Sequence, residues 1–196
     1  MIRVLAFSDM HLSRRCAAEI VAASADADLV VGAGDFCNMR QGLAAAMALL
    51  GGVRAPFVCV PGNAESADEL RAATGATVLH GERAEIAGLS IFGLGYGVPT
   101  TPFGAWSCDL TEAEAGSMLS GLDGAGILIS HSPPKGVADV TSTGSPVGST
   151  AIRAAIERNQ PRLCLCGHIH DSWGSSGFIG QTAVHNLGPS ATWFEV

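Results

Sequence analysis

Short apolar runs alternate with alanine-rich segments through the first half of the chain. Residues 3–7, 28–31 and 57–60 are mostly apolar, which predicts strands buried on both faces. Between them, residues 14–23 and 40–50 carry apolar side chains at helical spacing. Strands joined by helices imply right-handed crossovers, so we expect a parallel sheet that is covered on both faces.

The second half of the chain is less regular. Residues 84–92 predict a hairpin that turns at Ala87-Gly88, and Thr111 followed by Glu114 predicts the capped start of a helix. The other expected elements are a loop over 93–104, a strand over 126–130, a loop over 132–148, a helix from Ser149 or Thr150 to Asn159, a strand over 163–166, and several short strands between Asp171 and Val196. No repeat or linker interrupts them, so we predict one mixed α/β domain over residues 1–196.

Composition narrows the class of protein. Of the 196 residues, 47% are hydrophobic and 15% are charged, which excludes a disordered chain. No apolar run approaches the roughly 20 residues that a membrane-spanning helix needs, and no basic segment followed by an apolar stretch opens the sequence. The net charge is −7 and Lys135 is the one lysine, so we expect neither a nucleic-acid-binding face nor a basic membrane patch. We therefore predict a cytoplasmic protein.

The six cysteines are scattered and mostly lie inside apolar runs. Without a secretion signal, they are expected to be reduced and buried, as small hydrophobic side chains. The paired spacing of a zinc finger is absent. We also expect the thiols of Cys164 and Cys166 to face opposite sides of a strand, where they could not share one metal ion.

Side chains of the kind that bind metals follow five of the predicted strands. They are Asp9, His11, Asp35, Asn63, His131, His168 and His170. In a sheet built by crossovers the carboxyl ends of the strands lie at one edge, where open α/β folds bind ligands, so these side chains should converge. Gly34, Gly62 and Gly167 stand beside them and suit turns that bring the backbone close to a ligand.

This donor set combines three oxygen ligands with four imidazoles, which favours Mn, Fe or Zn over Ca or Mg. Seven ligands exceed what one ion needs, so two ions that share a carboxylate are expected, an arrangement suited to hydrolysis of a phosphoryl group. Taken singly, Asp9, His11 and Asp35 could instead cap helices. His131 alone could lie at the edge of the core, and His168 and His170 could belong to a surface turn.

The same residues carry a family resemblance. Asp-Met-His at 9–11, Gly-Asp at 34–35, Gly-Asn at 62–63, His131 and Gly-His-Ile-His at 167–170 resemble the motifs of the calcineurin-like metallophosphoesterases, in the same order. Asn186-Leu187-Gly188-Pro189 faintly resembles a turn of that family. The resemblance implies two mixed sheets packed as a sandwich and flanked by helices.

The resemblance also implies two metal sites. One ion would be held by Asp9, His11, Asp35 and His170, and the other by Asp35, Asn63, His131 and His168. Asp35 would bridge the two ions, and Asn63 and His131 would also face the substrate, which makes Asp35, Asn63 and His131 the expected catalytic residues.

One position departs from the family pattern. Many members carry a histidine after Gly-Asn that contacts phosphate or protonates the leaving oxygen, whereas this chain has Ala64 followed by Glu65. Because alanine cannot move a proton, we expect activity to depend on the leaving group, unless His80, His185 or Glu65 takes over.

The leading hypothesis is a phosphoesterase that acts on a phosphorylated small molecule, either a monoester or a diester. An alternative is a catalytically weak or inactive scaffold of the same fold that binds a protein or a ligand. A single-metal redox enzyme is a third hypothesis, and it would leave several of the seven candidate ligands without a role. Phe103 and Trp106 could form an apolar wall of the cleft or merely anchor a loop, and Trp173 is expected to serve in packing.

Overall fold

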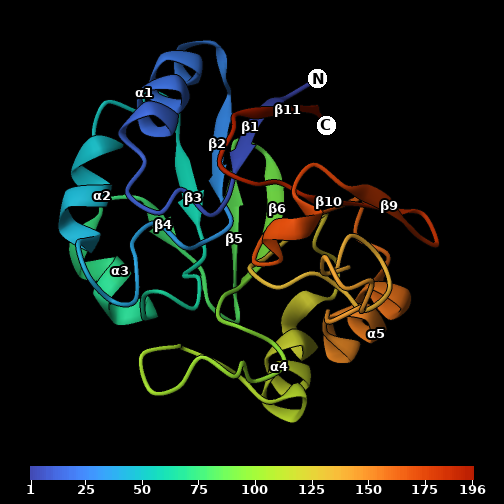
Figure 1. Ribbon diagram of the computed structural model, residues 1–196. Coiled ribbons are helices and arrows are strands. Elements are labelled where there is room, and N and C mark those ends of the chain that lie inside the picture. The colour runs from blue at the N-terminus through green and yellow to red at the C-terminus, as the bar shows by residue number, and fades with distance from the viewer.

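Eleven strands form two sheets in the computed structural model, which describes residues 1–196 (Figure 1). The first sheet has the order β11 (Thr192–Glu195), β1 (Arg3–Phe7), β2 (Leu29–Gly32), β3 (Phe57–Cys59) and β4 (Thr77–Val78). The second has the order β5 (Glu82–Ile86), β6 (Leu89–Leu94), β7 (Ile127–Ser130), β8 (Leu163–Cys166), β10 (Thr182–Asn186) and β9 (Ser176–Ile179). The central strands are parallel, and β11, β5 and β9 are antiparallel to their neighbours.

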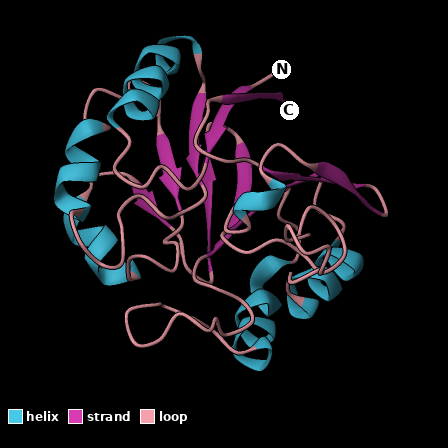
Figure 2. Cartoon of the chain, viewed as in Figure 1, coloured by secondary structure: helices cyan, strands magenta, loops and turns pink.

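Helices cover the outer face of each sheet (Figure 2). They are α1 (Arg14–Ala23), α2 (Leu43–Leu49), α3 (Ala67–Ala73), α4 (Glu112–Met118) and α5 (Thr150–Asn159), with short 3₁₀ helices at Ser24–Asp26, Leu119–Leu122 and His170–Ser172. None of these helices is both long and apolar enough to span a bilayer. Because β11 pairs with β1, the two chain termini lie side by side (Figure 1).

Alternate residues of each central strand face different cores. Phe7 packs in the core beneath α1 to α3, whereas the neighbouring Ala6 packs between the two sheets. In the second sheet Leu128 faces the α4 and α5 side, and Ile129 faces the first sheet. The uniform apolar runs of the sequence therefore reflect burial on both faces, one against helices and one against the other sheet. The predicted sandwich of two mixed sheets flanked by helices is confirmed.

Most predicted elements lie within a few residues of the observed ones. The hairpin turns at Ala87 and Gly88, both with positive φ, and Thr111 and Glu114 form a capping box at α4. The helix predicted over 40–50 begins only at Leu43, because the residues before it make a turn that ends with Gly42 at a φ of 83°.

Two elements were not predicted from the sequence, and one expectation was wrong. Helix α3 has a capping box from Ser66 to Glu69 that was visible in the sequence, and β4 is too short to give a pattern. Cys164 and Cys166 lie in the same core cluster, since residues two apart along a strand point to the same face. All six cysteines are unpaired, and only Cys108 is not fully buried.

Candidate metal centre

The seven predicted ligands come together at one edge of the sandwich. Each follows the carboxyl end of a parallel strand: β1, β2 and β3 in the first sheet, and β7 and β8 in the second. A cleft of about 290 Å³ opens between them, lined by His11, Asp35, Asn63, His168 and His170 together with Phe103 and Trp106. Asp9 and His131 are almost fully buried, 1% and 0% exposed. Both sheets therefore contribute to the site.

The backbone that presents these side chains is strained. Asp9, His11, Asp35 and His168 have φ values of 52°, 45°, 57° and 67°, in the left-handed region that residues other than glycine rarely adopt. Such conformations cost of order 1–3 kcal/mol each and persist only where surrounding contacts enforce them. None of these residues caps α1, whose N-cap is Ser13. Helix capping therefore does not account for Asp9 and His11.

Two glycines allow the loops of different strands to touch. A Cβ atom on Gly62 would overlap the Asp35 carboxylate, and one on Gly34 would lie 2.7 Å from His131 Nδ1. Gly34 also has a φ of 93°. Glycine at these positions therefore brings the loops after β2, β3 and β7 within reach of one another.

The first cluster consists of Asp9, His11, Asp35 and His170, whose ligand atoms all lie within 4.8 Å of one another. His11 Nε2 lies 3.3 Å from His170 Nε2 and 3.6 Å from Asp35 Oδ2. His11 Nδ1 donates to the Cys37 carbonyl at 2.9 Å, because a carbonyl can only accept. A neutral His11 thus presents the lone pair of Nε2 to the cluster, as a metal ligand does.

The second cluster consists of Asp35, Asn63 and His131. His131 Nε2 lies 3.1 Å from Asn63 Oδ1 and 3.5 Å from Asp35 Oδ1, while its Nδ1 donates to the Ala33 carbonyl at 2.8 Å. If His131 is neutral, three acceptor atoms face one another without a proton between them. Positive charge resolves this conflict, either as a proton on the imidazole or as a cation. Burial disfavours that proton, but the charges of Asp35 and Asp9 outweigh burial and raise the pKa of His131.

Asp35 lies between the two clusters, with Oδ2 toward His11 and Oδ1 toward His131. Its Oδ1 also accepts from the Ala64 backbone N–H at 2.8 Å, which fixes the plane of the carboxylate. Burial raises the pKa of Asp35 and the charge of Asp9 adds to this, against the opposing effect of His131. The carboxylate is therefore electrostatically suited to a site that holds cations.

Asp9 and His168 complete the predicted set in different ways. Burial alone would raise the pKa of Asp9, but His170, His131 and Ser8 outweigh it and lower the value to about 2. Burial lowers the pKa of His168 to about 3, so this imidazole is neutral. Its ring lies 4.9 Å from that of His131, between centroids, and makes no hydrogen bond of its own. His168 is thus near the second cluster and free to act as a ligand.

Three further residues fix the amide of Asn63, and sequence reasoning missed them. Asn63 Nδ2 donates to Ser107 Oγ at 3.1 Å, and Ser107 in turn donates to Asp109 Oδ1 at 2.9 Å. Asp109 also accepts from the hydroxyl and the backbone N–H of Thr101. Because the carboxylate accepts only, Ser107 must accept from Asn63, which turns Asn63 Oδ1 toward His131. No spacing along the chain signals this long-range contact.

Trp173 and Ser8 hold the Asp9 carboxylate. Trp173 Nε1 donates to Asp9 Oδ2 at 3.1 Å, and Ser8 Oγ donates to the same oxygen at 2.5 Å. Ser8 Oγ accepts in turn from the Gly188 backbone N–H at 2.9 Å, so the turn at Asn186-Leu187-Gly188-Pro189 supports this site. The expectation that Trp173 serves only in packing is incomplete, since it also hydrogen bonds to Asp9.

None of the three candidates for the absent histidine lines the cleft. Glu65 is fully buried, and its carboxylate accepts from the backbone N–H groups of Asp35 and Gly62, both at 2.8 Å. Burial and the Asp35 charge raise the pKa of Glu65 to about 7. His80 Nδ1 accepts from the Gly95 backbone N–H, and His185 packs against Phe194. Glu65 therefore positions the loop of Asp35 rather than serving the cleft.

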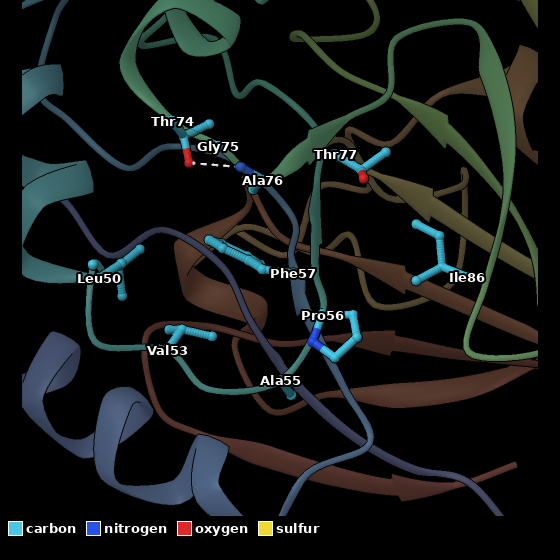
Figure 3. Close-up of a pocket in the computed structure, with 11 residues that line it drawn as sticks. Leu50, Val53, Ala55, Pro56, Phe57, Thr74, Gly75, Ala76, Thr77 and Ile86 are labelled. Atoms are coloured by element: carbon cyan, nitrogen blue, oxygen red, sulfur yellow. Dashed lines mark hydrogen bonds between the residues drawn. The ribbon is translucent and has the colours of Figure 1, made fainter.

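A separate cavity of about 440 Å³ lies at the opposite end of the first sheet (Figure 3). It is lined by the segments that precede β3 and β4, including Pro56 and Ala76, and by Ile86 at the end of β5. It has no titratable side chain, so it offers no group for acid–base catalysis or for binding a metal.

The chain belongs to the calcineurin-like phosphoesterase superfamily, whose domain model matches residues 2–194. No curated protein matches the sequence. Solved structures with a similar fold include TT1561 of Thermus thermophilus, with 16% identity, a TM-score of 0.75 and coverage of 98% of both chains. A dimetal phosphatase from Danio rerio has 13% identity and a TM-score of 0.62, over 96% of this chain and 88% of that one. The purple acid phosphatase PPD1 from yellow lupin seeds has 14% identity and a TM-score of 0.58, over 100% of this chain and 46% of that one.

Proposed function

We propose that this protein is a metal-dependent phosphoesterase that uses two divalent ions to hydrolyse a phosphomonoester or phosphodiester of a small molecule. The observation that carries the proposal is the position of Asp35, which directs one carboxylate oxygen toward each of two clusters of ligand atoms. Two histidines in these clusters, His11 and His131, are oriented by backbone carbonyls so that Nε2 faces the other ligands. This arrangement fits metal ions and leaves the ligands mutually repulsive without positive charge.

Each ion would have four protein ligands. The first set is Asp9, His11, Asp35 and His170, and the second is Asp35, Asn63, His131 and His168. The mixture of oxygen and nitrogen donors favours Mn, Fe or Zn. Such ions, when bound, supply Lewis acidity toward phosphoryl oxygens and lower the pKa of water.

The chain itself contributes orientation and shape. No lysine or arginine lines the cleft, so attraction of an anionic substrate depends on the ions. Asn63 and Asp35 both line the cleft, and a residue outside the cleft fixes each of them: Asn63 donates to Ser107 Oγ, and Asp35 accepts from the Ala64 N–H. Neither Ala64 nor the buried carboxylate of Glu65 can protonate a leaving oxygen in this cleft. The proposed activity should therefore favour leaving groups that depart as stable anions.

The test is metal analysis followed by an activity assay on one preparation. We expect two ions per chain after reconstitution with Mn, hydrolysis of aryl phosphate esters, loss of activity with a chelator, and recovery when Mn is returned. A plateau at one ion would contradict the dinuclear site. Two bound ions with no hydrolysis of aryl mono- or diesters would contradict the enzyme and favour the scaffold.

A further inference from the structure

A second cavity adjoins the metal cleft and shares two of its walls. This cavity of about 370 Å³ lies between residues 98–103 on one side and Thr141, Val147 and Ile169 on the other. Phe103 and His168 line both the cavity and the metal cleft. A molecule whose phosphoryl group occupies the cleft can therefore extend past these two rings into the cavity. We call this cavity the side chamber.

The side chamber is mostly apolar, and the only ionisable side chain in its lining is His168, which also lines the metal cleft. Two of its three threonine hydroxyls are already hydrogen bonded within the protein. Thr101 Oγ1 bonds with Asp109 at 2.8 Å, and Thr141 Oγ1 bonds with Ser145 O at 3.2 Å. A sugar or a nucleobase needs several polar partners, and Thr100 is the one threonine of the chamber whose hydroxyl hydrogen is not already donated within the protein.

Solvent-exposed hydrophobic side chains mark the same place. Phe103 is 50% exposed and Val147 is 37% exposed, and these two of the eight exposed large hydrophobic residues both line the chamber. Phe103 stacks parallel to Trp106, with 5.6 Å between ring centroids and an interplanar angle of 6°. Exposed apolar side chains that meet around a cavity are typical of a ligand site, because binding removes them from water.

The walls are held in place before any ligand arrives. The loop between β6 and α4, the long green-yellow arc in Figure 1, is fixed by the hydrogen bonds of Asp109 to Thr101 and Ser107. The Val98 backbone N–H donates to Ser132 Oγ at 2.8 Å, which ties the start of this loop to the segment after β7. A chamber whose walls are already ordered loses less entropy on binding.

We propose that the side chamber binds an uncharged apolar group of the substrate, so that the enzyme prefers phosphoesters of aryl or alkyl alcohols over those of sugars and nucleosides. This proposal rests on the phosphoesterase function and specifies its substrate class. Among apolar alcohols, aryl alcohols agree best with Ala64, because an aryloxide leaves without the proton that alanine cannot supply.

The test compares three aryl phosphates with leaving groups of similar acidity: 1-naphthyl, phenyl and 3-carboxyphenyl phosphate. We expect kcat/KM to fall in that order. Val147→Asp should lower kcat/KM for 1-naphthyl phosphate about 10-fold or more, mainly through KM, and leave inhibition by inorganic phosphate unchanged. Val140→Asp is the matched control, since Val140 is 44% exposed in the same loop but does not line the chamber.

A binding measurement separates this proposal from the proposed function. The metal-free protein should bind 1-naphthol, followed by tryptophan fluorescence, and Val147→Asp should weaken that binding while Val140→Asp should not. If Val147→Asp does not fold, Val147→Thr tests the same contact with a smaller expected weakening. Absence of hydrolysis with 1-naphthol still bound would overturn the enzyme but not the chamber. Equal kcat/KM for the three esters, or equal 1-naphthol binding in all variants, would overturn the chamber.

Discussion

Asp35→Asn tests the bridging role most sharply, because the structure predicts which of the two clusters it disables. Asp35 Oδ1 accepts from the Ala64 N–H at 2.8 Å, so the amide that replaces the carboxylate must place its oxygen there. The reversed amide would set its NH₂ against the Ala64 N–H, at a cost of about 1–3 kcal/mol, a preference of about 5- to 150-fold. The amide NH₂ then occupies the position of Oδ2, which lies 3.6 Å from His11 Nε2.

An amide NH₂ cannot bind a metal, so the cluster of Asp9, His11 and His170 should lose a ligand while the His131 side keeps an oxygen. We expect the Mn stoichiometry of Asp35→Asn to fall from two ions toward one, and turnover to fall by about 10²-fold or more, since each ion contributes several kcal/mol. Metal analysis and steady-state kinetics measure the two effects. Asp26→Asn, at an exposed carboxyl without a hydrogen bond, is the matched control.

Circular dichroism and thermal unfolding of the same preparations are needed because metal binding and folding can be linked. A folded Asp35→Asn protein that binds two ions with the affinity of the wild type would refute the reasoning. A folded variant that binds no ion would refute the asymmetry between the clusters but keep the bridge.

Three further outcomes are expected. Ser107→Ala should free the Asn63 amide and weaken one of two Mn binding steps by about 10- to 100-fold in a metal titration, whereas an unchanged titration would mean that Ser107 does not position Asn63. Ala64→His should raise turnover of alkyl phosphates more than that of aryl phosphates, because the imidazole can protonate an alkoxide. Since Ala64 is only 2% exposed, the larger side chain should also lower the free energy of unfolding by about 1–3 kcal/mol. Equal wild-type activity on both ester classes would contradict the premise. Burial, with a contribution from Arg71, lowers the pKa of His80 from 6.5 to about 4, so its share of the stability is present above pH 6.5 and is lost as the pH falls toward 4. His80→Gln should therefore lose less stability than the wild type on acidification, as measured by urea unfolding of the metal-free proteins at neutral pH and near pH 4.5, and an equal loss would contradict the assignment.

The alanine at position 64 and the side chamber both favour the same class of substrate. Ala64 stands at the position where the family resemblance leads us to expect a histidine, and the three alternative acids do not line the cleft. The chamber walls are mostly apolar, and the hydroxyls of Thr101 and Thr141 already donate hydrogen bonds within the protein. Both features favour an ester whose organic part is apolar and whose leaving group needs no proton.

The sequence by itself determined most of the central strands and predicted candidate ligands at their carboxyl ends. Residues 3–7 and 163–166 have the bounds of β1 and β8, because a strand buried on both faces is apolar over nearly its whole length. The candidate ligands could be proposed because each comes within a few residues after such a strand, and the edge where parallel strands end is a consequence of topology. The helix α3 was missed even though its capping box, from Ser66 to Glu69, was visible.

Only the tertiary structure decided how these residues are used. An apolar run indicates that a strand is buried but not what covers it, so the packing of the two sheets against each other emerged only from the tertiary structure. The supports of the ligands are contacts between distant segments: Trp173 on Asp9 and Ser107 on Asn63. Such contacts produce no recognisable residue spacing in the sequence, because they depend on where the loops of different strands meet. The same holds for the side chamber, whose walls come from residues 98–103 and from Val147 and are joined only by the fold.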